Sequence, residues 1–259
     1  MIDTHAHIYS NKFLHDREDM LKKTFESGVH KIFMPNIDRE SIDGMLALEA
    51  AYPNQCYAMM GLHPCSVDAN FEKELALVEE WLQKRAFVAI GEMGIDLYWD
   101  KTYFEEQKEA FRIQAAWAKQ YKKPLVIHTR NSMTETIALL TELNDDDLFG
   151  IVHCFGGTLE EANQIIELGF LLGIGGVATF KNGGLDKVLP HIDLAHLVLE
   201  TDSPYLAPKP YRGKRNEPSY IPLIAQRIAD LKEVSVDFVS EVTDRNALKV
   251  FGLLEEKVY

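Results

Sequence analysis

Eight short apolar runs, which alternate with longer segments of helical periodicity, constrain the fold of this chain most strongly. Successive runs start between 19 residues (151 to 170) and 38 residues (87 to 125) apart, enough for one helix and two short loops. The runs are Ile2–His7, Lys31–Pro35, Cys56–Gly61, Phe87–Glu92, Leu125–His128, Ile151–His153, Phe170–Ile174 and Leu197–Thr201. Most are apolar at consecutive positions, which predicts strands of a parallel sheet covered on both faces.

The intervening segments have the periodicity of helices. Phe71, Leu75, Val78 and Leu82 form one apolar stripe, and 218–231 and 236–251 read as two further helices after the eighth strand. We therefore expect an α/β fold, a single (β/α)8 TIM barrel over residues 1–259 with additional C-terminal helices. An open doubly wound sheet is the competing fold, but no GxGxxG follows the first strand to support its dinucleotide-binding form.

Composition narrows the class of function. With 27 Lys+Arg against 40 Asp+Glu, the net charge of −13 argues against nonspecific coating of nucleic acid, although not against a local phosphate site. No apolar run is long enough to cross a membrane, and Met1 leads directly into polar sequence without the features of a signal peptide. The three cysteines cannot all pair, so reduced thiols and a cytoplasmic location are expected. No obligate protein partner is evident.

Histidines and carboxylates fall at the carboxyl ends of the predicted strands, where barrel enzymes place their chemistry. They are His5, His7, Glu92, His128, His153 and Asp202. Each alone also has a structural interpretation, such as a helix cap for Asp202. Together they predict a divalent metal site, because six unpaired polar groups at one end of a barrel would be costly.

The size of this set predicts two divalent metal ions per subunit. Six groups exceed the three protein ligands of an ordinary catalytic zinc site, and a glutamate can bridge two ions. Glu92 is placed to bridge, with His5, His7 and Asp202 on one ion and His128 and His153 on the other. The mixed ligands suit Zn²⁺, Mn²⁺ or Fe, while Mg²⁺ prefers more oxygen; the sequence does not choose among them.

These residues lie in motifs that resemble those of the TatD-related metal-dependent deoxyribonucleases, a group within the amidohydrolase-like barrels. The matching segments are 2–7 (IDTHAH), 61–64 (GLHP), 91–96 (GEMGID), 127–130 (IHTR), 152–155 (VHCF), 200–204 (ETDSP) and 212–218 (RGKRNEP). They occur in order from the first strand to the loop after the eighth. The resemblance implies a barrel with a divalent metal centre that hydrolyses phosphodiester bonds in DNA. The resemblance also implies that the family's metal ligands correspond to the same six residues of this chain.

The predicted reaction is attack of a metal-activated water on phosphorus, with Asp202 as the base and Glu92 as the bridging catalytic carboxylate. The expected substrate is DNA. We expect the protein to act on it as a 3′-5′ exonuclease at single-stranded ends. Candidate phosphate contacts are His63, Arg130, Arg212, Lys214 and Arg215, and aromatic residues near the strand ends (Tyr98, Trp99, Phe155 and Tyr205) could stack unpaired bases. A small-molecule amidohydrolase or phosphoesterase on the same centre is the first alternative. A metal-dependent binding protein without turnover is the second.

Overall fold

A computed structural model describes residues 1–254 of the chain. Its eight strands are β1 (Ile2–Asp3), β2 (Lys31–Met34), β3 (Cys56–Ala58), β4 (Ile90–Asp96), β5 (Leu125–Arg130), β6 (Gly150–Val152), β7 (Phe170–Ile174) and β8 (Leu197–Leu199). They form two parallel sheets, in the orders β1-β2-β3 and β4-β5-β6-β7-β8. All eight runs predicted from the sequence thus contribute a strand.

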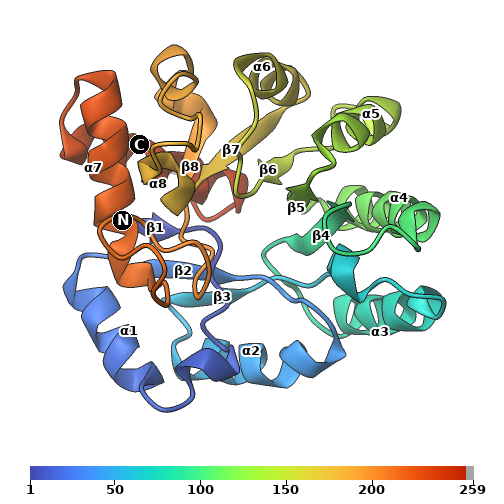
Figure 1. Cartoon of the computed structure of the whole chain (residues 1–259). Helices are drawn as coiled ribbons and strands as arrows, with labels where there is room; N and C mark the ends of the chain where they lie inside the picture. Colours follow the sequence, from blue (N-terminus) through green and yellow to red (C-terminus); the bar gives the residue numbers. More distant parts are fainter. Residues whose placement is uncertain (255–259) are drawn as a thin grey trace, which may run out of the picture.

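The two sheets are joined at both edges into one ring (Figure 1). A parallel bridge pairs Met60 with Ile90 between β3 and β4, and a second pairs Ala6 with Ser203 beyond β1 and β8. The Thr4 amide also donates to the Leu199 carbonyl at 2.9 Å. The barrel predicted from the sequence is therefore confirmed.

Helices surround the strands (Figure 1). They are α1 (Arg17–Glu26), α2 (Arg39–Ala51), α3 (Phe71–Lys84), α4 (Phe104–Tyr121), α5 (Met133–Leu143), α6 (Leu159–Glu167), α7 (Ile221–Lys232) and α8 (Val236–Val250). The predicted stripe of α3 faces inward, with Leu75, Val78 and Leu82 buried. None of the helices in residues 1–254 is both long and apolar enough to cross a membrane.

The connection between β7 and β8 departs from the predicted repeat. It contains three short 3-10 helices, Gly176–Thr179, Leu189–His191 and Leu194–His196, and no α-helix within the described chain. Gly183, Gly184 and Pro190 interrupt any helical run there. The two predicted C-terminal helices are confirmed as α7 and α8, and α7 packs against this irregular connection.

The first and fourth strands have bounds that differ from the prediction. β1 ends at Asp3, so His5 and His7 follow it in a hydrogen-bonded extension. β4 runs to Asp96, which puts Glu92 inside the strand and not at its end. A register shift between Gly91 and Met93 accompanies this extension. Gly94 permits the close pairing with β5, because a Cβ there would lie 2.0 Å from the His128 carbonyl oxygen.

The barrel interior near the amino ends of the strands is apolar, and the end of α8 closes it. Ile2, Phe33, Val126, Ile151 and Val198 pack there, and the Phe251 ring stacks on Phe33 with centroids 3.8 Å apart. Side chains two residues further along a strand point to the same side. His128, His153 and Glu200 follow Val126, Ile151 and Val198 at this spacing, so they enter the barrel interior nearer its carboxyl end.

Candidate metal centre

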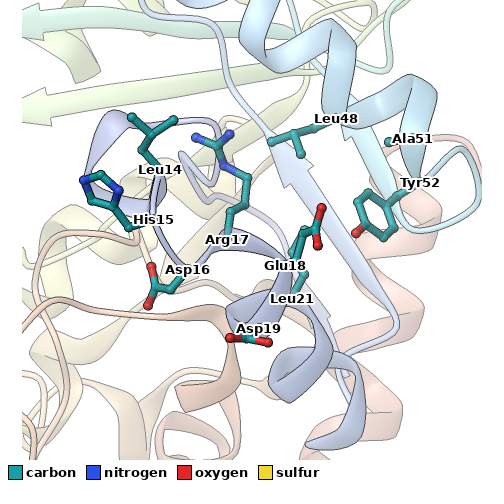
Figure 2. Close-up of a pocket in the computed structure, with 10 residues that line it drawn as sticks. All are labelled: Leu14, His15, Asp16, Arg17, Glu18, Asp19, Leu21, Leu48, Ala51 and Tyr52. Atoms are coloured by element: carbon teal, nitrogen blue, oxygen red, sulfur yellow. The ribbon is translucent and has the colours of Figure 1, made fainter.

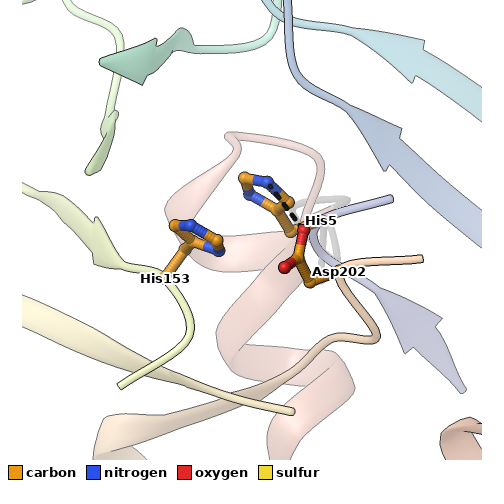
Figure 3. Close-up of side chains that lie close together, drawn as sticks. All are labelled: His5, His153 and Asp202. Carbon is orange, nitrogen blue, oxygen red and sulfur yellow. Dashed lines mark ion pairs between the residues drawn. The ribbon is translucent and has the colours of Figure 1, made fainter. Parts of the chain in front are cut away.

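Seven titratable side chains converge at the carboxyl end of the barrel. They form three groups whose ligand atoms lie within 4.8 Å of one another: His5, His7 and Glu92; His5, His153 and Asp202; and His63, Glu92 and His128. Figure 3 shows the second group, in which residues that follow β1, β6 and β8 meet. All six predicted metal ligands are thus brought together. His63, predicted as a phosphate contact, lies among them.

Glu92 occupies the middle of this cluster and is only 2% exposed. Its Oε2 atom lies 3.1 Å from His5 Nε2 and 3.4 Å from His7 Nε2. Its Oε1 atom lies 2.8 Å from His128 Nδ1 and 3.0 Å from His153 Nε2. Each carboxylate oxygen therefore faces a different set of imidazoles.

The side chains of the cluster set one another's protonation states. Burial alone would raise the pKa of Glu92, but the neighbouring charges of His5, His63 and His153 hold that pKa well below its usual range. Burial opposes protonation of His7, yet hydrogen bonds to Asp202 and Glu92 outweigh it and raise the pKa of His7 to about 10. Without metal, Glu92 is therefore ionised, and His7 is doubly protonated and positively charged at neutral pH.

The donor set fits a divalent cation. The Nε2 atoms of His5 and His7 lie only 3.3 Å apart, and the His5 and His153 rings stack with centroids separated by 3.8 Å. The buried Nδ1 of His5 has no hydrogen-bond partner among residues 1–254. Several imidazole nitrogens gathered around carboxylates are the ligands that Zn²⁺ and Mn²⁺ accept, and a cation relieves their crowding.

Two side chains that the sequence analysis missed orient the histidines. Asp96 Oδ2 lies 2.9 Å from His128 Nε2, opposite the ring nitrogen that faces Glu92. The Tyr9 hydroxyl donates to the Pro35 carbonyl and lies 2.8 Å from His7 Nδ1, so it accepts a hydrogen bond from the N–H at that position. This leaves Nε2 of neutral His7 free for a metal. Both residues follow a predicted ligand at even spacing, at 92 and 96 and at 7 and 9, which is the signal that could have identified them.

Two buried carboxylates support the ends of β1 and β8. Asp3 accepts hydrogen bonds from the amides of His5 (3.2 Å) and Thr201 (3.0 Å), so it holds the segments that carry His5 and Asp202 together. Glu200 accepts from the Cys154 amide at 2.5 Å, and its Oε1 lies 3.4 Å from His153 Nδ1. Both therefore position neighbouring ligands.

The predicted phosphate contacts lie in different surroundings. The Cys65 amide donates to His63 Nδ1 at 3.0 Å, so neutral His63 carries its proton on Nε2, which faces Glu92 Oε1 at 3.3 Å. Arg130, Arg212 and Lys214 are exposed, each with its cation over an aromatic ring. Arg215 instead pairs with Asp16 and Glu217. The roles of these side chains in phosphate binding stay predictions.

A separate hollow of about 410 Å³ lies beside α1 and α2 (Figure 2). Two of its charged side chains, Arg17 and Asp16, are engaged in structural contacts. The Arg17 guanidinium donates to the carbonyls of Ile8, Tyr9 and Ser10, and Asp16 pairs with Arg215. This hollow therefore lacks the convergent, unpaired chemistry of the metal centre.

Comparison with known proteins identifies the family. The family model described as "TatD related DNase" matches residues 2–252. The chain belongs to the TatD-related DNase family. The uncharacterized metal-dependent hydrolase YabD of Bacillus subtilis is 37% identical to this TatD-family chain over 254 residues, covering 98% of this chain and 99% of YabD.

Other relatives of this TatD-family chain extend the likeness to structure. The 3′-5′ ssDNA/RNA exonuclease TatD of Pectobacterium parmentieri is 32% identical over 260 residues, 98% of this chain and 100% of that protein. The crystal structure of YjjV, a TatD homologue of Escherichia coli, superposes with a TM-score of 0.92 at 30% identity over 98% of each chain. The protein is a metal-dependent hydrolase of the TatD family, and its fold is the barrel predicted from the sequence.

Proposed function

We propose that this protein hydrolyses phosphodiester bonds at the ends of single-stranded DNA, as a 3′-5′ exonuclease with two divalent metal ions. The position of Glu92 carries the proposal, because its two oxygens face separate sets of imidazoles. A carboxylate in that position can serve as a ligand to two ions. His5, His7 and Asp202 would complete one set of ligands, and His128 and His153 the other.

When bound, such ions lower the pKa of water and polarise a phosphoryl oxygen. The protein's own residues hold and move the proton. Burial would raise the pKa of Asp202, but its hydrogen bond to His7 and the charges of His153 and His5 keep that pKa below its usual value. The side chain is 14% exposed, so its ionised carboxylate can reach the water that attacks phosphorus and accept its proton.

His63 is suited to contact the substrate. The Cys65 amide holds the ring in the form that carries a proton on Nε2, and that nitrogen points into the cluster. A donor in this position can bind a non-bridging phosphoryl oxygen and stabilise the charge that develops during attack. His63 therefore acts as a hydrogen-bond donor in the proposed reaction.

The nucleic-acid substrate is supported by the surface around the centre and by a relative. Tyr205 is 43% exposed, its ring lies 6.0 Å from the His7 ring, and Lys12 Nζ lies 4.5 Å above it. Aromatic rings beside cations are typical of surfaces that bind single strands. The Pectobacterium parmentieri relative is named a 3′-5′ ssDNA/RNA exonuclease.

A small phosphoester is the second candidate substrate. The engagement of Arg215 by Asp16 and Glu217 favours it, because the loop of residues 209–215 then offers fewer free cations to a polynucleotide. The metal centre would serve either substrate.

A time course on a 5′-labelled single-stranded DNA tests the proposal. Metal-free protein is supplied with Mg²⁺, Mn²⁺ or Zn²⁺ in turn, and Glu92→Ala controls for contaminating nucleases. We expect a ladder that shortens from the 3′ end with the wild type and is absent with the variant. An intact oligonucleotide under every metal, together with cleavage of a small phosphodiester, would transfer the assignment to the second candidate.

A further inference from the structure

The loop after β4 carries two exposed aromatic side chains close to the metal centre. Tyr98 is 52% exposed and Trp99 is 69% exposed. Their rings meet edge to face, with centroids 4.9 Å apart and an interplanar angle of 87°. Trp99, the more exposed of the two, therefore offers a ring on which a planar ligand can stack.

A cation completes this surface. Arg130, at the end of β5, is exposed, and its guanidinium carbon lies 3.9 Å from the Tyr98 ring centroid and 5.3 Å from that of Trp99. The guanidinium covers one face of the Tyr98 ring, and the three neighbouring exposed side chains are here named the Tyr98–Trp99–Arg130 platform. It offers stacking faces together with a positive charge for a phosphate.

One carboxylate ties the platform to the metal centre. Asp96 Oδ1 accepts hydrogen bonds from the amides of Tyr98 (2.9 Å) and Trp99 (3.1 Å). The other oxygen of Asp96 lies 2.9 Å from His128 Nε2, and His128 Nδ1 lies 2.8 Å from Glu92 Oε1. The loop that bears the two rings is therefore held at a fixed position relative to the proposed reaction centre.

Two cavities adjoin residues of the platform. A cavity of about 190 Å³ borders Trp99, Tyr103 and Pro64. A wider one of about 510 Å³ borders Arg130, Asn131 and Cys154. A nucleobase on the platform would therefore have room on either side for the strand that carries it.

We propose that the Tyr98–Trp99–Arg130 platform binds one unpaired nucleobase of the substrate strand, at a fixed number of nucleotides from the scissile phosphate. This inference rests on the proposed function, since it places the strand whose end lies at Glu92. Stacking requires an unpaired base, because the faces of a base inside a duplex are covered by its neighbours. The platform would thus favour single strands, and Arg130 would add attraction for an adjacent phosphate.

The first test measures binding of a fluorescein-labelled oligothymidylate to the metal-loaded enzyme by anisotropy. Phosphorothioate linkages at its 3′ end slow cleavage during the measurement. We expect Trp99→Ala to weaken binding roughly 5- to 150-fold, the effect of losing one stacked base, and Trp99→Phe to retain most of the affinity. Phe238→Ala is the matched control, because Phe238 is an aromatic residue 49% exposed at the start of α8. Its affinity should equal that of the wild type.

An abasic scan then tests whether Trp99 contacts a base. In the wild type, one abasic position near the 3′ end should weaken binding by about the same factor as Trp99→Ala. In Trp99→Ala, the same position should cause no further loss, because both changes remove one contact. Equal losses at that position in both proteins, or unchanged affinity of a folded Trp99→Ala, would overturn the proposal.

Hydrolysis of bis(p-nitrophenyl) phosphate by the metal-loaded wild type separates this failure from failure of the proposed function. That substrate has a phosphodiester but no nucleobase. Turnover of it together with unchanged DNA affinity of Trp99→Ala would overturn the platform alone. Absence of turnover on both this substrate and DNA would overturn the proposed function.

Discussion

His128 lies between two carboxylates, with its Nε2 2.9 Å from Asp96 Oδ2 and its Nδ1 2.8 Å from Glu92 Oε1. Burial would lower the pKa of His128, but hydrogen bonds to both carboxylates raise it. The Asp96 contact thus fixes which ring nitrogen faces Glu92. This relationship makes Asp96 a positioning residue for a proposed metal ligand.

Asp96→Asn should therefore weaken metal binding by about 10- to 100-fold, the usual effect of removing such a partner. The asparagine oxygen can still accept the Tyr98 and Trp99 amides, so the loop should stay in place. Chelator competition measures the affinity, and Asp100→Asn in the same exposed loop is the control. Equal affinities of Asp96→Asn and wild type would show that Asp96 does not orient His128.

Metal affinity should rise with pH. The pKa of His7 is raised to about 10 in the metal-free protein, so at neutral pH a metal must displace its proton. Raising the pH lowers the cost of that displacement, by up to about tenfold in affinity per pH unit for each proton released. Calorimetry at pH 6, 7 and 8, in buffers of different ionisation enthalpy, measures both affinity and released protons. Affinity that falls with rising pH would contradict the protonation described for His7.

The cations after β8 should divide into two kinds. Arg212 is exposed, so Arg212→Ala should raise the KM for DNA and reduce its salt dependence by about one charge. Arg215 pairs with Asp16 and Glu217, at 2.6 Å and 2.9 Å, and is partly exposed, so solvent screens these pairs. Arg215→Ala should cost about 1 kcal/mol of unfolding free energy. Denaturant titrations and steady-state kinetics in a salt series distinguish the two variants. A larger KM effect for Arg215→Ala than for Arg212→Ala would reverse these roles.

The stacking of Phe251 on Phe33, at the end of the barrel opposite the metal centre, should contribute to stability and not to chemistry. Phe251 is 3% exposed and stacks on Phe33, so Phe251→Ala should cost about 3–5 kcal/mol of unfolding free energy. Urea unfolding of the metal-free protein measures it, with Leu14→Ala, 60% exposed, as the control. A loss below 1 kcal/mol would mean that the Phe33–Phe251 contact does little to hold the barrel.

The sequence predicted the barrel because each gap between strands has room for one helix and two short loops, and most of the strands are apolar at consecutive positions. It also predicted which residues meet, because carboxyl ends of parallel strands share one end of a barrel. The irregular β7–β8 connection was missed, since an expected helix was inferred from the length of the gap alone. Buried Leu185 and Leu189 still fill the core there without helical geometry.

The details of the centre depended on strand bounds that periodicity does not fix. Extension of β4 to Asp96 moved Glu92 into the strand and brought Asp96 to His128. His63 was predicted as a phosphate contact, and only the fold shows that it reaches Glu92. The ion pair of Arg215 with Asp16 could not be predicted, because Asp16 lies 199 positions away in the sequence.

The metal content of Glu92→Gln, measured together with its turnover, tests the central claim most directly. The claim is that Glu92 joins two metal sites. We therefore predict that elemental mass spectrometry finds about two equivalents of Mn²⁺ or Zn²⁺ per wild-type chain. Glu92→Gln should lose at least one equivalent and nearly all hydrolysis of bis(p-nitrophenyl) phosphate, while Glu79→Gln on the exposed face of α3 keeps both. Full metal content and full turnover in Glu92→Gln would contradict the account.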